Sequence, residues 1–304
     1  MSTKLTHVAP KLPSNRSACS NPIKAAGATG QVIARELRAC HVDMTLAPVL
    51  DVNTNPNNAV IGDRSYGSKF QTAAKCGSSF IENLQANGVA GCAKHWPGHG
   101  DTREDSHDAL PSLPHHISRL ESIEMAPFRA AVSANVASAL VAHLLVPAIE
   151  PQAHVPASCS AKAVTHLRKN LRFGDGVVMT DDMEMGALKH IQWPNDESDV
   201  RYDSGAVPRA AAEGLRAGID LFLACHTRQL QLDIIDALTR AIERDESTKA
   251  KATAANRRLD ALCDAYVSVA PPGPFGTSGP TTVVDPGWGT TTVARAMGAP
   301  RGRL

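Results

Sequence analysis

Several features that mark special classes of protein are missing from this sequence. No apolar run approaches the roughly eighteen residues that a transmembrane helix needs, and residues 1–17 lack the apolar stretch of a secretory signal. Neither sign of charge dominates, because 31 basic residues face 30 acidic ones and the formal net charge is +1. This balance gives no reason to expect a nucleic acid or an anionic membrane as a partner.

Cysteine motifs and short repeats are missing as well. The seven cysteines are scattered singly and include no C-x-x-C pair, which argues against a disulfide framework and against a zinc ribbon. We therefore expect reduced thiols and a cytoplasmic location. No self-similarity at a period of about 20–50 residues is found, so a repeat architecture is not expected.

Composition and length are those of an ordinary soluble globular protein. Of the 304 residues, 43% are hydrophobic and 20% are charged, and a chain of this size can bury a large core. The character changes from Pro271 onward, where 13 of the last 34 residues are glycine or proline. We expect one domain over residues 22–268, a linker-like segment over residues 1–21 and a disordered tail over residues 269–304.

Apolar, β-branched-rich runs alternate with helical patterns along the chain. The runs predict strands over Met44–Val52, Val89–His95, Ala139–Val146, Gly176–Asp181 and Ile219–Cys225. The remaining patterns predict helices over Pro22–Cys40, Ser68–Asn87, Ile117–Ala134, Ala161–Leu171, Ser204–Gly218, Thr227–Arg244 and Ser247–Val267. This alternation indicates parallel β/α units around a buried sheet.

Polar side chains recur at the carboxyl ends of the predicted strands. They are Asp51, Lys94, His95, His143, Asp181, Asp182 and His226. Their regular placement favours an α/β fold of the TIM-type (β/α) barrel class, with the active site on that face. A closed barrel of this type has eight strands and only five are found, so we expect the barrel to be incomplete.

One run, Lys94 to Pro111, concentrates the chemistry of the chain. It reads KHWPGHGDTREDSHDALP and places a lysine, three histidines and four acidic residues around two glycines and two prolines. Burying so many titratable groups without partners is costly, and glycine and proline interrupt regular structure. The run therefore predicts a loop that displays reactive groups after the strand that ends near His95.

Within this loop, Asp105 and His107 form a candidate proton-transfer pair. Residues two apart on an extended segment point to the same side, so the carboxylate can hold the imidazole and raise its proton affinity. A histidine held in this way can act as a general acid and then as a general base. An isolated D-x-H is more often a hydrated surface loop, and the neighbouring residues decide between the two interpretations.

The run closely resembles the signature of glycoside hydrolase family 3, in its β-N-acetylglucosaminidase branch. That branch carries K-H-F-P-G-H-G, then D-S-H, then L-P; the sequence has KHWPGHG from Lys94, Asp105-Ser106-His107 and Leu110-Pro111. Trp96 for phenylalanine is the single change in the first block. A match over so many positions is highly specific.

Other segments resemble the same family in the same order. Residues 46–52 and 61–67 look like its A-P-V-L-D-V and I-G-x-R-S-[FY] pair, and residues 176–185 look like its G-V-[IV]-x-[ST]-D-D-L-x-M block. The short match over residues 140–143 is weak alone. The resemblance covers about residues 8 to 245.

The resemblance implies a catalytic nucleophile at Asp181. Its carboxylate would attack the anomeric carbon and form a glycosyl-enzyme ester, which water then releases with retention of configuration. We prefer Asp181 to Asp182 because the family's first aspartate ends the strand. Asp182 is expected in a supporting role near the following helix.

The resemblance also implies the other site residues. His107 would be the general acid/base with Asp105 beside it, and Arg64, Lys94 and His95 would bind sugar hydroxyls. The alternative for these three is ion pairing with Asp51 or Asp63 at the rim of the barrel. The implied partner is a carbohydrate substrate, and no cofactor or metal is implied.

The remaining residues of the motifs support weaker expectations. His99 is expected to shape the loop, and His143 to be a satisfied polar residue near the pocket. Met183 and Met185 are expected to pack. Trp96 could stack on a sugar, but packing in the core is the more frequent role of such a residue.

The sequence departs from the family at its beginning. The family's barrel starts with three strands before A-P-V-L-D-V, and the third ends in D-x-E-G-G-R-V; no such segment is found before residue 46. The strand count falls short of eight by the same number. We therefore expect the first three strands to be missing, and a chain that is poorly stable or incompletely active.

The leading hypothesis is a retaining exo-β-N-acetylhexosaminidase acting on muropeptide or chitooligosaccharide fragments, as in cell-wall recycling. Within the family, β-glucosidase-like specificity or phosphorolysis is an alternative, and a truncated sugar-binding remnant without activity is another. From a different class, His95, His99, Asp101 and His107 could hold a metal, although their spacing matches no standard metal motif.

Overall fold

The computed structural model describes residues 21–58, 60–103, 110–189, 191, 193 and 205–267. Within this part of the chain, no helix is long and apolar enough to cross a membrane. The predicted proton-transfer pair Asp105 and His107, the first 20 residues and the predicted tail over residues 269–304 lie outside the described residues.

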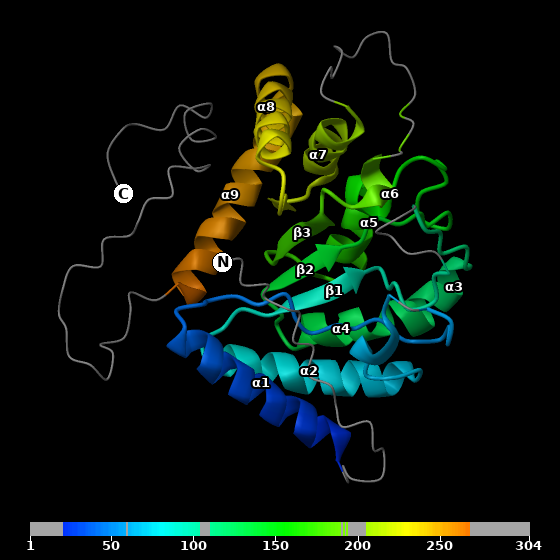
Figure 1. Cartoon of the computed structure of the whole chain (residues 1–304), viewed down its shortest axis with the longest axis vertical. Coiled ribbons are helices and arrows are strands. Elements are labelled where there is room, and N and C mark those ends of the chain that lie inside the picture. Colours follow the sequence, from blue (N-terminus) through cyan, green and yellow to red (C-terminus); the bar gives the residue numbers. More distant parts are fainter. Residues whose placement is uncertain are drawn as a thin grey trace, which may run out of the picture.

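The centre of the molecule is a parallel four-stranded sheet (Figure 1). Its strands are β1 (Cys92–Trp96), β2 (Ser138–Val141), β3 (Val177–Asp182) and β4 (Leu221–Leu223), and they lie side by side in chain order. Helical segments join each strand to the next, because parallel neighbours need a crossover connection. The arrangement confirms the predicted α/β class.

The prediction of a regular strand over Met44–Val52 is wrong. It forms only isolated parallel bridges, Val49 with Lys94 of β1 and Met44 with Ala90 just before β1. Backbone bonds still connect the two segments, for example from Leu50 N to the Lys94 carbonyl at 2.6 Å. Pro48 lacks a backbone N–H and interrupts the ladder. Among the described residues the sheet therefore has four strands and one irregular fifth segment, fewer than a closed barrel.

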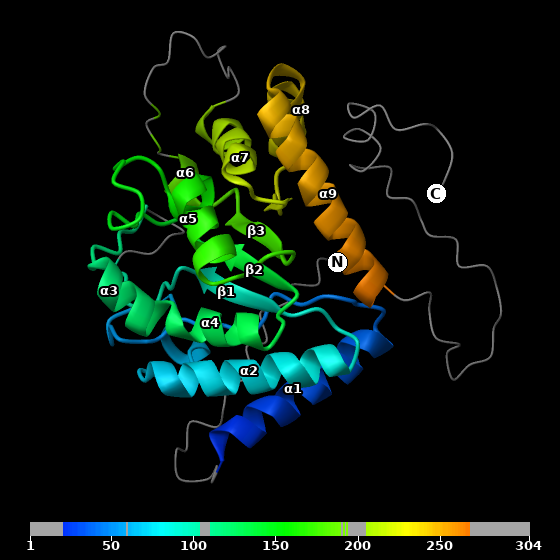
Figure 2. The same ribbon diagram turned by 180° about the vertical axis from the view of Figure 1, so that it is seen from behind.

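Two long helices, α1 (Pro22–Ala39) and α2 (Phe70–Ala86), lie side by side beneath the sheet in both views (Figures 1 and 2). Helix α1 begins where the Asn21 side chain accepts the backbone N–H of the third helical residue at 3.0 Å. The two helices approach closely at Gly30, where a Cβ would lie 2.5 Å from the Phe80 carbonyl oxygen. Only glycine fits this crossing.

The other helical segments have 3 to 12 residues before β4 and 17 or 21 residues after it. They are η1 (Gly62–Arg64), α3 (Ile117–Arg119), η2 (Leu120–Glu124), α4 (Ala126–Ser133), η3 (Ala157–Cys159), α5 (Ala161–Thr165), η4 (His166–Asn170), α6 (Gly186–Lys189), α7 (Ala206–Ala217), α8 (Arg228–Arg244) and α9 (Glu246–Tyr266). The predicted helices are thus present, with two of them continuing from α-helix into a π-helical turn at η2 and η4.

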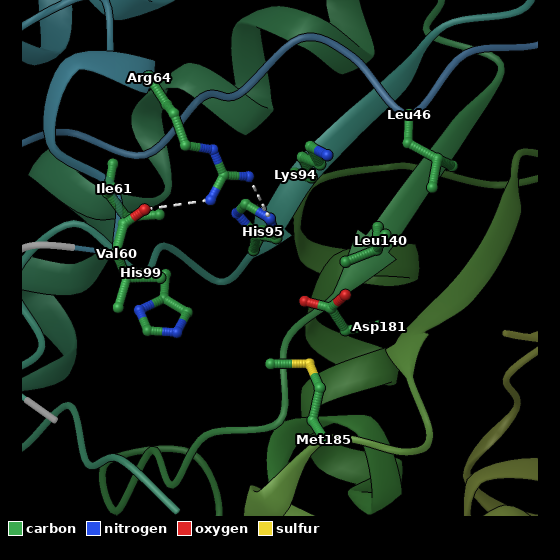
Figure 3. A pocket seen from close by; sticks show the side chains of 10 residues that line it. All are labelled: Leu46, Val60, Ile61, Arg64, Lys94, His95, His99, Leu140, Asp181 and Met185. Carbon is green, nitrogen blue, oxygen red and sulfur yellow. Dashed lines mark hydrogen bonds between the residues drawn. The ribbon is translucent and has the colours of Figure 1, made fainter. Parts of the chain in front are cut away.

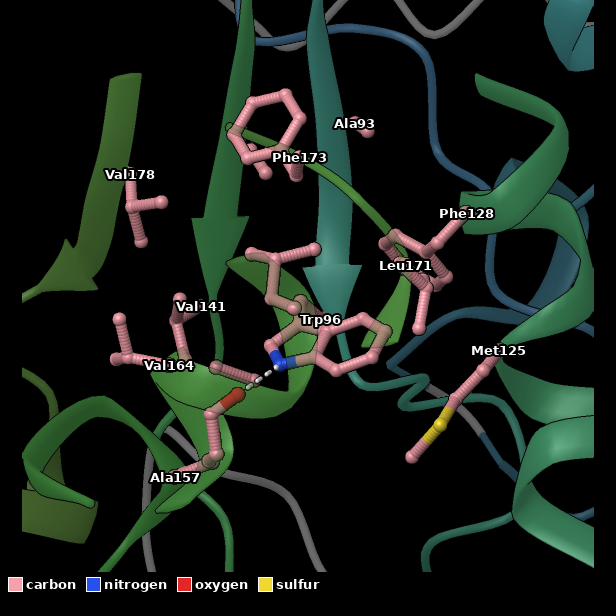
Figure 4. Packing of buried hydrophobic residues seen from close by; sticks show 14 of the residues in the cluster. Ala93, Trp96, Met125, Phe128, Val141, Ala157, Val164, Leu171, Phe173 and Val178 are labelled. Carbon is pink, nitrogen blue, oxygen red and sulfur yellow. Dashed lines mark hydrogen bonds between the residues drawn. The ribbon is translucent and has the colours of Figure 1, made fainter. Parts of the chain in front are cut away.

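One face of the sheet forms the main core with α4 and α5, and Trp96 lies in it (Figure 4). The indole is fully buried, and its ring meets Phe128 edge-on at a centroid distance of 5.5 Å and stacks on His166 at 6.0 Å. Its Nε1 donates to the Ala163 carbonyl at 3.3 Å. Trp96 is therefore a core residue, which is the more frequent role expected for it.

The opposite face of the sheet carries a second apolar cluster and is covered by α9. Cys92, Leu140, Val177 and Met179 form this cluster, and Leu259 and Leu262 of α9 pack against it. Both views show α9 on the side of the sheet away from α5 and α6 (Figures 1 and 2). In a closed barrel this face would be filled by side chains from further strands; here a helix takes part of that place.

Candidate active site

A polar pocket opens at the carboxyl ends of β1 and β3 (Figure 3). Its cavity has a volume of about 80 Å³. Its lining residues are Leu46, Val60, Ile61, Arg64, Lys94, His95, His99, Leu140, Asp181 and Met185. The pocket thus brings together four of the residues predicted from the sequence, Arg64, Lys94, His95 and Asp181.

A β-bulge places two consecutive residues of β1 at this pocket. Lys94 pairs with Leu140 on β2, whereas Trp96 pairs with the very next residue, Val141. His95 is therefore the extra residue of a bulge, which re-aims side chains at the end of a strand. Lys94 and His95 both reach the pocket, and Trp96 returns to the core face.

His95 is held from behind by the carboxylate of Asp51. The ring Nδ1 lies 2.7 Å from Asp51 Oδ2, and the His95 backbone N–H donates to Asp51 Oδ1 at 3.2 Å. Asp51 itself is fully buried. Burial by itself would raise the pKa of Asp51, but His95 and His99 together hold it below the ordinary value. Asp51 therefore stays ionised beneath the pocket.

Arg64 lies on the other side of His95. Its Nη2 is 3.4 Å from His95 Nε2, and its Nη1 donates to the Val60 carbonyl at 3.1 Å. The turn that carries Arg64 is tied to the neighbouring segment, because Ser65 Oγ donates to the Asp51 carbonyl at 2.6 Å. The guanidinium is thus fixed at the pocket wall.

Lys94 places a buried amine in the same pocket. The residue is 4% exposed. Burial and the nearby Arg64 guanidinium lower the pKa of Lys94, and Asp181 and Asp51 offset part of that effect. An amine in such a site can donate hydrogen bonds to sugar oxygens while carrying a charge that its acidic neighbours balance.

Asp181 ends β3 and faces these groups across the pocket (Figure 3). Its Oδ1 accepts the backbone N–H of Asp182 at 2.9 Å. Burial by itself would raise the pKa of Asp181, but His95 and His143, with the Asp182 N–H and Lys94, lower it below the ordinary value. The carboxylate is therefore ionised at neutral pH, as a carboxylate nucleophile must be.

The segment after Asp181 is anchored by a buried histidine. His143 Nδ1 lies 2.7 Å from Ser158 Oγ, and its Nε2 lies 3.2 Å from the Asp182 carbonyl oxygen. The carbonyl can only accept, so Nε2 carries the proton and Nδ1 accepts from the serine hydroxyl. His143 has both ring nitrogens satisfied, consistent with its expected role as a buried polar residue beside the pocket.

Asp182 turns away from the pocket. Its Oδ1 accepts the Glu184 backbone N–H at 3.1 Å, and its Oδ2 lies 3.4 Å from His226 Nε2. Met183 packs in a separate apolar cluster, whereas Met185 lines the pocket next to Asp181 (Figure 3). The position of Met185 could not be read from its spacing alone.

Two glycines shape the start of the loop that follows β1. A Cβ on Gly100 would lie 2.0 Å from the Val52 carbonyl oxygen, so no side chain fits there. Gly98 has a φ of +125°, and a Cβ on it would lie 2.9 Å from the Glu124 Cβ. The loop thus packs closely against its neighbours at both positions, which explains why they are glycines.

Asp101 fastens the same loop to two other segments. Its Oδ1 accepts from Thr54 Oγ1 at 2.7 Å, and its Oδ2 accepts from Arg119 Nη2 at 3.1 Å and from His115 Nε2. His99 contributes to this anchoring, since its carbonyl accepts from Asn58 Nδ2 at 2.8 Å. The described start of the loop is therefore rigidly placed beside the pocket.

The possible metal site has no support among the described residues. No group of three or more histidine, cysteine, aspartate or glutamate side chains in that part of the chain is arranged to hold a metal ion. His107, one of the four residues of that hypothesis, lies outside it.

Comparison with known proteins decides the family. The family described as "Glycosyl hydrolase family 3 N terminal domain" matches residues 4–262. The chain belongs to glycosyl hydrolase family 3. The resemblance seen in the motifs is thereby confirmed, and the parallel α/β sheet is that of an incomplete TIM-type barrel.

The family 3 relatives include curated and solved proteins. A beta-hexosaminidase of Neisseria gonorrhoeae is 32% identical over 216 residues, which are 71% of this chain and 55% of the relative. A beta-hexosaminidase of Methylococcus capsulatus is 32% identical over 241 residues, or 79% of this chain and 65% of the relative. A glycoside hydrolase family 3 beta-N-acetylglucosaminidase from Paenibacillus sp. superposes with a TM-score of 0.75 at 37% identity, covering 90% of this chain and 49% of that chain.

This family 3 chain therefore spans about half to two thirds of the length of these three relatives. Sequence reasoning offered Asp51 only as an alternative ion-pairing partner of the sugar-binding residues, and it missed the hydroxyl of Ser158 behind His143. Asp51 was recognisable as a polar residue at a strand end. Ser158 stands in no motif, so nothing in the sequence could have indicated it.

Proposed function

We propose that this protein is a retaining exo-β-N-acetylhexosaminidase that removes terminal β-linked N-acetylglucosamine from muropeptide or chitooligosaccharide fragments. The observation that carries the proposal is the ionised Asp181 facing Arg64, Lys94 and His95 across one pocket. The relatives named beta-hexosaminidase support it. A cytoplasmic role in cell-wall recycling fits the scattered cysteines.

The first step would be carried by Asp181. Its carboxylate oxygen attacks the anomeric carbon and forms a glycosyl ester, while the bond from that carbon to the leaving oxygen breaks. The leaving oxygen takes a proton from His107, which is left neutral. Arg64 and Lys94 are placed to donate hydrogen bonds to sugar oxygens during this step.

The second step reverses these roles. His107 takes a proton from a water molecule, and the water oxygen attacks the anomeric carbon, so that the ester to Asp181 breaks and the sugar leaves with retained configuration. The support for His107 and its partner Asp105 is the D-S-H match together with the anchored start of their loop at Asp101. A histidine in this role suits neutral pH.

The nucleophile can be tested by trapping. The chain is incubated with a 5-fluoro derivative of N-acetylglucosamine that carries a good leaving group, digested and analysed by mass spectrometry. We expect a covalent sugar on the peptide that contains Asp181. A label on another residue would overturn the assignment.

The activity is measured on p-nitrophenyl N-acetyl-β-glucosaminide, with p-nitrophenyl β-glucoside as the competing substrate and with or without inorganic phosphate. We expect Asp181→Asn to lower kcat by at least roughly a thousandfold. Asp63→Asn is the control, because this exposed carboxylate neighbours Arg64 in sequence without lining the pocket. Acceleration by phosphate would indicate phosphorolysis, and sugar binding without turnover would indicate an inactive remnant.

A further inference from the structure

Asp51 is a fully buried carboxylate that does not line the pocket. It contacts three groups that lie behind the pocket wall. Its Oδ2 meets the ring Nδ1 of His95 at 2.7 Å. Its Oδ1 accepts the backbone N–H of His95 at 3.2 Å and that of His99 at 2.6 Å. One side chain thus joins the residue that lines the pocket to the start of the loop that follows it.

The chemistry of these contacts determines where the ring proton of His95 lies. An ionised carboxylate can only accept hydrogen bonds, and the pKa of Asp51 is held below its ordinary value. The ring Nδ1 must therefore donate. In a neutral imidazole the other nitrogen, Nε2, then carries a lone pair and can only accept.

Arg64 supports the same proton position independently. Its guanidinium can only donate, and its Nη2 lies 3.4 Å from His95 Nε2. A proton on Nε2 would bring two donors together. The two neighbours of the ring, a carboxylate on one side and a guanidinium on the other, therefore favour a single tautomer.

We propose that Asp51 is a positioning residue that locks His95 in the Nδ1–H form and so turns Nε2 toward the substrate as a hydrogen-bond acceptor for a sugar hydroxyl. The inference rests on the proposed function of the pocket and deepens it. Asp51 would not touch the substrate and would act through His95. By accepting the His99 N–H, it also fixes the start of the loop relative to His95.

An acceptor at this place complements the other polar groups of the pocket. Arg64 and Lys94 are donors, and Asp181 is committed to the anomeric carbon in the proposed reaction. A sugar hydroxyl both donates and accepts, so a wall of donors alone would leave its hydrogen without a partner. His95 Nε2 supplies the missing acceptor when the hydroxyl displaces or shares the Arg64 contact.

The substitution Asp51→Asn tests this, because it keeps the size of the side chain and exchanges one acceptor for a donor. The two backbone N–H groups at Oδ1 need an acceptor, so the amide oxygen is expected to stay there and the amide NH2 to face His95 Nδ1. The ring would then have to accept at Nδ1 and carry its proton on Nε2. Asp51→Asn is therefore expected to reverse the tautomer of His95.

The tautomer is read from ¹⁵N-histidine spectra of the full chain, with the His95 signals assigned by their loss in His95→Gln. Nδ1–H is expected in the unsubstituted protein and Nε2–H in Asp51→Asn. In kinetics on p-nitrophenyl N-acetyl-β-glucosaminide, kcat/KM is expected to fall by roughly 10–100-fold with most of the change in KM, as for other partners that orient a ligand-binding histidine.

Asp43→Asn is the matched control. Asp43 stands earlier in the same segment and pairs with Arg38 at the far end from the pocket. We expect it to leave the His95 signals and KM unchanged. Thermal unfolding of both variants separates a loss of stability from a change in the pocket.

The outcomes divide clearly. A folded Asp51→Asn that keeps the Nδ1–H form, or that loses stability with unchanged KM, overturns the proposal and leaves Asp51 a structural residue. If Asp51→Asn does not fold, the spectrum of the unsubstituted protein decides, since Nε2–H or a charged ring at neutral pH also overturns it. If the unsubstituted chain binds N-acetylglucosamine without turnover, the proposed function fails, and the affinity for that sugar replaces KM as the test of Asp51.

Discussion

Lys94 and Trp96 stand two residues apart on β1 and yet pair with adjacent residues of β2, Leu140 and Val141. On a regular strand, residues two apart share a face. Here His95 bulges out between them, so that Lys94 points into the pocket and Trp96 into the opposite core. The three consecutive residues Lys94, His95 and Trp96 thus supply two side chains to the polar pocket and one to the apolar core.

Trp96 can be tested as a core residue. Trp96→Ala would leave a cavity beside Phe128 and lower the free energy of unfolding by about 3–5 kcal/mol. Trp96→Phe keeps an aromatic ring and loses the bond to the Ala163 carbonyl, so the cost should be nearer roughly 1–2 kcal/mol. Urea unfolding measures both. If Trp96→Phe leaves stability intact but raises KM, the indole contacts substrate instead.

Gly100 tests how tightly the loop is pressed against its neighbour. Gly100→Ala would bring a Cβ to 2.0 Å from the Val52 carbonyl oxygen, so backbone must move, at a cost of roughly 1–3 kcal/mol. Gly174→Ala is the control, because nothing lies within 4 Å of its Cβ position and the change should stay within about 0.5 kcal/mol. Equal melting temperatures for the two variants would contradict this packing.

The free energy of unfolding should decrease as the pH falls below neutral, because His143 is buried. Burial lowers the pKa of His143 in the folded chain, whereas the unfolded chain titrates at about 6.5. Above that pH neither state is protonated and the full stability is present. As the pH falls below it, only the unfolded state binds the proton, so the free energy of unfolding decreases until the folded pKa is reached.

His143→Gln isolates this contribution. Glutamine can donate to the Asp182 carbonyl and accept from Ser158, so it can replace both contacts without titrating. Urea unfolding between pH 7 and 5 measures how steeply the free energy of unfolding falls with pH. In His143→Gln this slope should be smaller than in the unsubstituted chain by up to about 1.4 kcal/mol per pH unit. His41→Asn serves as the control, since His41 is exposed with a φ of +57° that asparagine tolerates. An unchanged slope in His143→Gln would contradict the assignment.

Asp220 is expected to hold α9 in place. Its buried carboxylate accepts from Arg258 Nη1 of α9 at 2.9 Å, from Arg168 Nη2 at 2.5 Å and from the Val178 N–H at 2.8 Å. Asp220→Asn leaves two guanidinium groups without their counter-charge and should cost about 3–5 kcal/mol.

The control for this network is Asp236→Asn, which removes an exposed pair within α8 and should cost no more than about 0.5 kcal/mol. Proteolysis provides a second measurement, because α9 should become more susceptible to cleavage in Asp220→Asn than in Asp236→Asn. Equal susceptibility would show that the leucines of α9 hold it without the ion pairs.

The prediction from the sequence was most successful where local patterns suffice. The strand near Val89–His95 and the helices on either side follow from periodicity, and the structure contains them. Arg64, Lys94 and Asp181 were singled out by short blocks that resemble the family, and the structure places all three in the lining of one pocket. Met44–Val52 was predicted as a strand because its residues are apolar and β-branched. Pro48 and the sparse bridges to β1 make it irregular, an outcome that depends on pairing partners.

The amino-acid sequence by itself determined the order of β/α units and the residue types at the strand ends, because these depend on spacing along the backbone. Its motif blocks also carried the resemblance to the family. Only the tertiary structure decided that His95 bulges from its strand, that Asp51 and Arg64 approach it from opposite sides, and that α9 covers the inner face of the open sheet. These contacts join segments that are far apart in the chain. Hydrogen bonds and packing between such segments produce no periodic pattern in the sequence, so they cannot be predicted from it.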